Sequence, residues 1–202
     1  MTQYAFHFDS SRCTGCKTCQ VACKETYKLG PNNLYRKVLN YQGGTWKPTE
    51  AGHYVPEGVF GYFVSLACNH CTDAACVANC PTGAMQKDPD TGIVWTDHDV
   101  CIGCKTCISA CPYGAPSYDE ASSTTFKCDG CYDRRQRGEL PACVAACPGA
   151  NLALDDMESL QGAHAADIVS DESSGTKPNF VITVDAALAE EPDDIVAENH
   201  TA

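Results

Sequence analysis

Sixteen cysteines dominate the chemistry available to this 202-residue chain. They form four groups of four, and the last two cysteines of each group are separated by three residues. Thiolates at such short spacing bind metals or join as disulfides. No Ser-His-Asp set, carboxylate pair or phosphate-binding loop stands out beside them. In chain order, groups one to four are Cys13, Cys16, Cys19 and Cys23; Cys68, Cys71, Cys76 and Cys80; Cys101, Cys104, Cys107 and Cys111; and Cys128, Cys131, Cys143 and Cys147.

Three kinds of site compete for these cysteines. Disulfides are disfavoured because C-x2-C-x2-C places three thiols in one tight turn, and no signal peptide indicates an oxidising compartment. Four zinc sites would use every cysteine, but zinc sites pair two knuckles and need no third cysteine at this spacing. The run C-x2-C-x2-C-x3-C-P is that of bacterial ferredoxins. We therefore expect four [4Fe–4S] clusters, with no cysteine left over.

The ferredoxin pattern also predicts which cysteines share a cluster. Three cysteines on a tight loop hold one cluster, and the fourth ligates the neighbouring cluster. Groups two and three are close in sequence and are expected to pair, which leaves groups one and four as the other pair. We name the four expected ligand sets A to D. Set A is Cys13, Cys16, Cys19 and Cys147; set B is Cys23, Cys128, Cys131 and Cys143; set C is Cys68, Cys71, Cys76 and Cys111; set D is Cys80, Cys101, Cys104 and Cys107.

Short repeated elements are expected to position these groups. FDSSRCTGCKTCQVAC and TDHDVCIGCKTCISAC align without a gap. Alternating or apolar segments before the first three groups, YAFHF, VFGYFVSLA and GIVW, predict strands, and QVACKETY, VANC and ISAC predict short helices. LYRKVLNYQGGTW (34–46) predicts a hairpin that turns at its two glycines. The fold class is therefore α+β, with two interleaved ferredoxin-like modules of two clusters each and an inserted hairpin.

The charge divides the chain into two regions. Residues 151–202 hold twelve acids and one base, whereas residues 1–150 hold fourteen acids and thirteen bases. We expect a four-cluster domain over 1–150, with an insertion at 24–67, and an acidic extension over 151–202. DDMESLQGAHA (155–165) predicts a helix and NFVITVD (179–185) a strand. The last fifteen residues are expected to be mobile or to lie along a partner.

Two classes of partner contact are disfavoured. No basic stripe indicates nucleic-acid binding. GVFGYFVSLAC (58–68) is the longest apolar stretch, and it is too short for a membrane span, so membrane contact is expected through another subunit.

A few residues beside the cysteines have alternative interpretations. His70, within CNHC, is expected to be a locally bonded loop residue and not a ligand. Arg134 and Arg135 begin a basic run suited to docking a partner, although a solvated face is the usual meaning of such a run. Glycines that precede ligand cysteines are expected to adopt positive φ; these are Gly15, Gly103 and Gly130.

SSRCTGCKTC, CNHC, VCIGC, ACPYGAP and KCDGCYDR carry a resemblance over residues 4–150. The chain resembles the iron–sulfur beta subunits of the molybdopterin oxidoreductases, most closely those of the anaerobic dimethyl sulfoxide reductase type. The resemblance implies a non-catalytic relay, in anaerobic respiration, between a molybdopterin catalytic subunit and a quinol-oxidising membrane anchor. It places set A towards the catalytic subunit and set D towards the anchor. Some relatives have Trp at the position of Cys104 and a three-iron cluster there, so Cys104 implies a complete cubane.

Other functions stay open at this point. The same relay would serve a formate dehydrogenase, a polysulfide reductase or a dehydroxylating molybdoenzyme equally well. A cluster-dependent scaffold that assembles a complex without carrying current is an alternative of a different class. The resemblance implies a membrane-associated complex, either exported with a twin-arginine partner or cytoplasmic.

Overall fold

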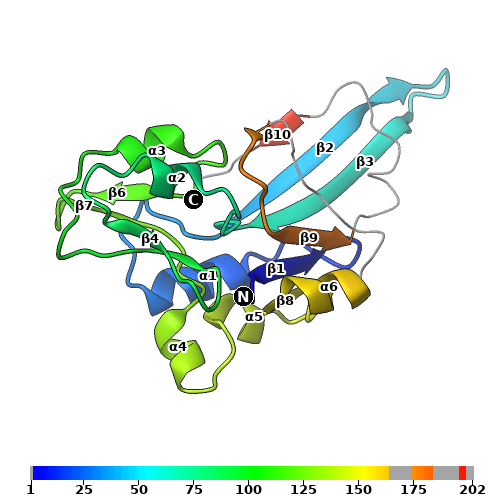
Figure 1. Ribbon diagram of the computed structural model, residues 1–202. Helices are drawn as coiled ribbons and strands as arrows, with labels where there is room; N and C mark the ends of the chain where they lie inside the picture. The colour runs from blue at the N-terminus through cyan, green and yellow to red at the C-terminus, as the bar shows by residue number, and fades with distance from the viewer. Residues whose placement is uncertain (1, 164–173, 184–195, 199–202) are drawn as a thin grey trace.

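A three-stranded sheet joins segments from opposite ends of the sequence. The computed structural model describes residues 2–163, 174–183 and 196–198. Strand β1 (Tyr4–Asp9) lies at the centre of this sheet (Figure 1). It pairs antiparallel with β8 (Leu152–Asp156) and parallel with β9 (Phe180–Thr183). The first strand is thus held in place by two strands from the last quarter of the sequence.

Both faces of β1 are buried, and each face belongs to a different core. Phe6 and Phe8 point into the main core, which also contains buried cysteines of groups one, two and four. Ala5 points the other way and packs against Leu160 of α6 (Met157–Ala163). Because successive side chains of a strand alternate between its faces, YAFHF serves two cores at once.

The cysteine groups lie on short helices and loops around this sheet. Helix α1 (Thr18–Thr26) of group one contacts α5 (Ala142–Ala145) of group four. Helix α2 (Ala75–Ala78) of group two contacts α3 (Thr106–Ala110) of group three. The remaining elements of the body are two small hairpins and one helix: β4 (Met85–Lys87) with β5 (Val94–Thr96), β6 (Ser117–Asp119) with β7 (Thr124–Phe126), and α4 (Tyr132–Gln136).

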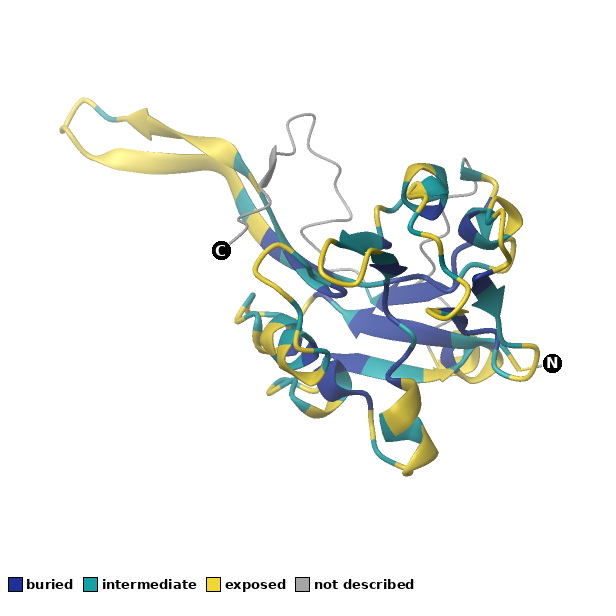
Figure 2. Ribbon diagram, turned by 90° about the vertical axis from the view of Figure 1, so that its left-hand side faces the viewer, coloured by how far each residue is buried: buried dark blue, intermediate teal, exposed yellow. Residues whose placement is uncertain are grey.

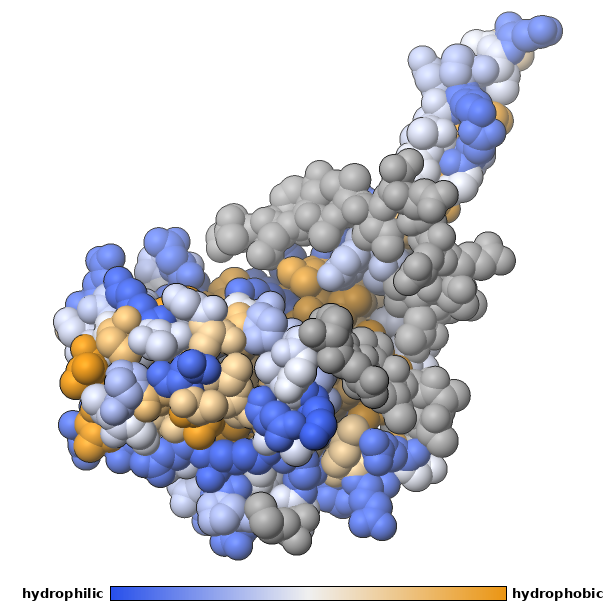
Figure 3. All heavy atoms as spheres, turned by 45° about the horizontal axis from the view of Figure 1, so that its top comes forward, coloured by the Kyte–Doolittle hydropathy of each residue, from blue (hydrophilic) through white to orange (hydrophobic). Residues whose placement is uncertain are grey.

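A long two-stranded arm extends from the body. It consists of β2 (Lys37–Pro48) and β3 (Tyr54–Leu66), which pair antiparallel along their length. Figure 2 shows the outer half of the arm exposed and only its base buried. In Figure 3 the arm stands clear of the body, and its surface is mostly hydrophilic. Only the base of the arm therefore shares a core with the rest of the protein.

The predicted hairpin turn at Gly43 and Gly44 is wrong. The chain turns at residues 49–53, and both glycines lie within β2, where the register with β3 shifts. Gly44 has a φ of 92°. A glycine with positive φ allows an extra residue to be accommodated as a β-bulge, which bends the strand without reversing it. The same glycine signal thus marks a bulge in this arm.

Replacing Gly44 by Ala is expected to loosen the arm. A Cβ atom at Gly44 would overlap the carbonyl oxygen of Gly58 on β3, and φ would remain positive. We expect the opening free energy of the arm to fall by roughly 1–3 kcal/mol, measured by amide hydrogen exchange in β2 and β3. Gly61→Ala is the matched control, because a Cβ atom there lies 3.9 Å from its nearest neighbour, Tyr41 O. Equal exchange in both variants would contradict the bulge explanation.

The other predicted elements are largely confirmed. Strands form before the first three groups, and each of these groups has a short helix; α1 contains Cys23, whereas α2 and α3 end before Cys80 and Cys111. The predicted tail helix and strand form as α6 and β9, while residues 164–165 and 184–185 of those predictions lie outside the described residues. Within the last fifteen residues, β10 (Val196–Glu198) pairs with β2 of the same chain, and 188–195 and 199–202 lie outside the described residues. No helix among the described residues is long and apolar enough to cross a membrane.

Candidate functional site

Two cavities are lined by four cysteines each. One is bounded by the cysteines of set C, together with Pro112 and Lys127. The other is bounded by the cysteines of set D, together with Met85 and Thr125. Across the described ranges, no three Cys, His, Asp or Glu side chains converge as the ligands of a single metal ion do. Four thiols around a cavity are the donors of a [4Fe–4S] cluster, so the residues present fit that group.

The cysteines of sets A and B lie together although they come from opposite ends of the sequence. The charges of Cys19, Cys147 and Cys16 all raise the pKa of Cys13, after the larger effect of burial. Burial raises the pKa of Cys23 to about 12, and the charge of Cys143 adds to it. Cys19, Cys23 and Cys143 are buried in one core, and Cys13 and Cys147 pack against it, so α1 and α5 share one cysteine-rich region. Group one thus lies beside group four, and group two beside group three.

Exposure differs from one set to the next. All four cysteines of set B are buried. In set C two are buried and two are half-buried. Sets A and D each have one exposed cysteine, Cys16 and Cys104 respectively. Cys128 of set B is close enough to Cys68 of set C for their charges to interact, and Cys76 of set C packs in one hydrophobic cluster with Cys107 of set D. The sets therefore follow one another in the order A, B, C, D, with an exposed sulfur at each end.

Hydroxyl groups surround the sulfurs of the two outer sets. Thr18 Oγ1 lies 3.3 Å from Cys16 Sγ, and Thr106 Oγ1 lies 3.3 Å from Cys104 Sγ. The hydrogen bond from Thr18 lowers the pKa of Cys16. Because hydrogen bonds to the charged form favour it, Thr18 stabilises the thiolate of Cys16. Each threonine belongs to a GCKTC sequence, so the repeat carries the donor as well as the ligands.

Backbone amides point at other sulfurs. Met85 N donates to Cys80 Sγ at 3.4 Å, Gly130 N to Cys128 Sγ at 3.4 Å, and Asn151 N to Cys147 Sγ at 3.3 Å. Such donors help to hold negative charge on sulfur, as the second shell of a metal site does. The amides come from β4 and from two loops, and they serve sets D, B and A.

The ligand loops adopt the conformation expected of their glycines. φ is 66° at Gly15, 65° at Gly103 and 67° at Gly130, as predicted. The lysine that follows the second cysteine is also left-handed, with φ of 58° at Lys17 and 63° at Lys105. The Lys105 ammonium lies 3.9 Å from the centroid of the Tyr118 ring, a cation–π contact. These paired left-handed residues curl each loop around its cysteines.

His70 is buried, and its bonds are not confined to its own loop. Its Nδ1 accepts from Val94 N at 3.1 Å, while its carbonyl oxygen accepts from Asn179 Nδ2 at 2.8 Å. Burial, followed by the charge of Lys127, lowers its pKa well below the ordinary value. The prediction of local bonding is therefore too narrow, because His70 connects the group two loop to β5 and to the segment before β9.

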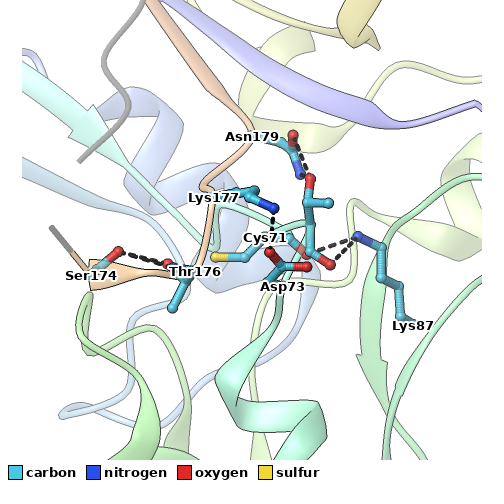
Figure 4. Close-up of polar contacts among 8 residues, drawn as sticks. Cys71, Asp73, Lys87, Ser174, Thr176, Lys177 and Asn179 are labelled. Atoms are coloured by element: carbon cyan, nitrogen blue, oxygen red, sulfur yellow. Dashed lines mark hydrogen bonds and ion pairs between the residues drawn. The ribbon is translucent and has the colours of Figure 1, made fainter. Parts of the chain in front are cut away.

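The segment 174–179 lies across the loop of Cys71 (Figure 4). Thr72 N donates to Lys177 O at 2.9 Å, and Asp73 N donates to Thr176 O at 3.0 Å. Lys177 Nζ lies 2.8 Å from Asp73 Oδ2, and on the other side of the loop Lys87 Nζ donates to Cys71 O at 2.8 Å. Thr176 also lines the cavity of set C. No cysteine lies in this segment, so the cysteine pattern alone could not associate it with the site.

A further cavity borders set B without containing a cysteine. Tyr27, Trp95 and Phe126 are among the aromatic residues that line it. The Tyr27 hydroxyl donates to Asp129 Oδ1, and its hydrogen bond also lowers the pKa of Cys131 against the larger effect of burial. Tyr27 therefore stands between this cavity and the sulfurs of set B.

The basic run of α4 makes contacts within its own chain. Arg134 Nε donates to Leu140 O at 2.8 Å, and Arg134 Nη1 lies 3.1 Å from Glu139 Oε2. Arg135 Nε donates to Gly130 O at 2.8 Å, next to the ligand loop of set B. These arginines hold the long loop of group four in shape, and their docking role stays a hypothesis.

Comparison with known proteins identifies the family. Residues 59–157 match the model of a 4Fe-4S dicluster domain, and residues 4–25 match a 4Fe-4S binding domain. The chain is 47% identical to the B subunit of anaerobic dimethyl sulfoxide reductase from Escherichia coli (strain K12), over 92% of this chain and 90% of the relative. This protein belongs to the family of dimethyl sulfoxide reductase iron–sulfur subunits.

Other iron–sulfur subunits of the family are similar over comparable lengths. The B subunit of anaerobic dimethyl sulfoxide reductase from Haemophilus influenzae is 44% identical over 90% of this chain and 89% of its own. The B subunit of polysulfide reductase from Wolinella succinogenes is 35% identical over 89% of this chain and 93% of its own. The family thus consists of iron–sulfur electron-transfer subunits of oxidoreductase complexes. The resemblance to this family that the cysteine motifs predicted is confirmed.

Proposed function

We propose that this chain relays electrons through four [4Fe–4S] clusters, held by sets A to D, in an oxidoreductase complex of the dimethyl sulfoxide reductase type. The observation that carries the proposal is the succession of the four sets, with exposed cysteines only in the first and last. A bound [4Fe–4S] cluster accepts and releases one electron at a time. A relay needs contact with partners at its ends and exclusion of water in its middle, and the burial of the four sets follows that order.

The chain's own residues have three tasks in this proposal. Cysteines from two groups hold each pair of neighbouring sites together, and groups one and four enclose groups two and three in the sequence, so that the ferredoxin-like modules are interleaved. Hydroxyl and amide donors, among them Thr18 and Met85, stabilise the charge on the sulfurs. Aromatic residues such as Tyr27 keep water from the buried sulfurs of set B.

The partners follow from the family. The catalytic partner is proposed to be a molybdopterin subunit at set A, and a membrane anchor that oxidises quinol is proposed at set D. Dimethyl sulfoxide is favoured as the terminal acceptor because identity to the dimethyl sulfoxide reductase subunit exceeds identity to the polysulfide reductase subunit, 47% against 35%.

Purification of the native complex without oxygen tests the proposal. Analysis of this subunit is expected to find roughly sixteen irons and no stoichiometric zinc. A redox titration followed by electron paramagnetic resonance should show four reducible clusters that re-oxidise when dimethyl sulfoxide is added. The reduced complex without acceptor is the control. Clusters that stay reduced in both samples would instead favour an assembly scaffold, and zinc in place of iron would overturn the cluster assignment.

A further inference from the structure

Arg36 is a buried cation in the main core. Its exposed fraction is 1%, and it is the largest fully buried side chain among the described residues. The guanidinium carbon lies 4.5 Å from the centroid of the Phe6 ring. Nη1 donates to the carbonyl oxygen and to Oγ of Ser65, at 3.1 Å in each case. An arginine is almost never fully buried without a partner of opposite charge, so its position requires an explanation.

The remaining donors of Arg36 have no bond within the described part of the protein. Neither Nε nor Nη2 has a hydrogen-bond partner there, although both atoms are buried. Leaving buried donors of a charged group unpaired is costly, and native proteins rarely do so without a functional reason. No carboxylate of the described ranges forms an ion pair with Arg36. The two free nitrogens are therefore available to an anionic group that the chain binds.

The surroundings of Arg36 identify that group. Burial alone lowers the pKa of Arg36, but the negative charges of nearby cysteines outweigh burial and raise it overall; these are Cys143, Cys128, Cys19 and Cys23. Three of them belong to set B, and Cys19 belongs to set A. Arg36 thus lies near cysteines of both sets, and Phe6, against which its guanidinium packs, belongs to the same core as those four cysteines.

Ser65 extends the influence of Arg36 towards set A. Its Oγ lies 3.4 Å from Cys19 Sγ and accepts from Arg36 Nη1. Because that oxygen already accepts a hydrogen bond, its own proton is available to the sulfur. A donor whose oxygen accepts from a cation is polarised and becomes a stronger donor. Arg36 therefore reaches Cys19 through Ser65, while its Nε and Nη2 atoms have no hydrogen-bond partner within the described residues.

We propose that Arg36 is the fixed counter-charge that raises the reduction potentials of the clusters held by sets A and B, with Ser65 passing part of its effect to Cys19. The inference rests on the proposed function. Reduction adds one electron to a cluster that is already anionic, so a buried cation nearby stabilises the reduced form more than the oxidised form. Arg36 is a positioning and tuning residue in this scheme, since the cysteines alone supply the ligands.

Potentiometric titration of the native complex, read by electron paramagnetic resonance, tests the inference. For Arg36→Gln we expect the one-electron reduction constant of the set B cluster to fall at least tenfold, a shift of about 59 mV. We expect a smaller shift at set A and unchanged potentials at sets C and D. Ser65→Ala should lower the potential of set A alone. Lys37→Gln, which removes a partly exposed cation from the neighbouring position, is the matched control and should change none of them.

The outcomes separate the inference from the function on which it rests. A wild-type complex with fewer than four clusters would overturn the proposed function, whatever the variants do. Four wild-type clusters with set A and B potentials unchanged in Arg36→Gln would overturn the inference alone, as would equal shifts at all four sets. If Arg36→Gln does not assemble, Ser65→Ala decides, because an unchanged set A potential in that variant contradicts the path from Arg36 to Cys19.

Discussion

Without iron, the chain is expected to lose its cooperative unfolding transition and its fixed tertiary structure. Eight of its buried residues are cysteines, and seven of these belong to the two larger hydrophobic cores. Structural metal sites contribute about 10–16 kcal/mol of folding free energy in zinc fingers, which equals or exceeds the whole stability of a typical domain, about 5–15 kcal/mol. Near-ultraviolet circular dichroism and calorimetry on protein made under iron depletion would measure the loss.

The state of the unligated thiols strengthens this expectation. Burial raises the pKa of Cys76 to about 12, as it does for Cys23, so at neutral pH both thiols stay protonated until a metal displaces the proton. Reconstitution with iron and sulfide is the control and should restore the cooperative transition. An iron-free chain that unfolds cooperatively, with the circular dichroism of the iron-loaded protein, would show that the polypeptide holds the fold by itself.

Cys147→Ser is expected to abolish the cluster of set A or to leave it incomplete, while the cluster of set B stays intact. Cys147 belongs to group four in the sequence, but its charge acts on Cys13 of group one. Loss of even an outer-shell partner costs roughly 10–100-fold in metal affinity, so loss of a ligand should cost more. Electron paramagnetic resonance should show one altered cluster. Electron delivery to the acceptor should fall with it, because set A is one end of the proposed relay.

Cys143→Ser, four residues earlier, is the matched comparison for Cys147→Ser. Cys143→Ser should alter the cluster of set B, since Cys143 acts on Cys23 and is buried beside it. Two cysteines of one short segment, α5 and the loop after its end, would then affect two different clusters. The same cluster responding to both substitutions would mean that group four holds its own cluster and that the crossed assignment is wrong.

Most strands and helices and the conformation of the cysteine-bearing loops could be predicted because they follow from local spacing. Alternating residues around Phe6 and Phe8 specify a strand, and C-x2-C-x2-C specifies a ligand loop, whatever the rest of the chain does. The prediction of a turn at Gly43 and Gly44 was wrong because it, too, rested on local sequence alone. A glycine pair signals positive φ, but the length of the pairing partner β3 decides whether the backbone reverses or only bulges.

The residues that serve the cysteines from a distance could not be predicted. Arg36 directly precedes β2, between Tyr35 and Lys37, and only the tertiary structure brings it close to the cysteines of α1 and α5. Ser65 is one of many serines in the chain, and its closeness to Cys19 depends on the packing of β3. Residues 174–179 reach the loop of Cys71 from a distant part of the sequence. Each of these contacts is set by long-range packing, for which a single sequence carries no periodic signal.

The central position of β1 in its sheet determines how late in synthesis the sheet can be completed. Both strands that flank β1 come from the last quarter of the sequence, as does the segment that covers the Cys71 loop. During synthesis β1 therefore has no complete sheet to join until Thr183, the end of β9, has left the ribosome. Such distant pairing makes folding slow. We therefore expect the sheet around β1, and with it iron binding by the cysteines that share its core, to be completed late, after both flanking strands have been made.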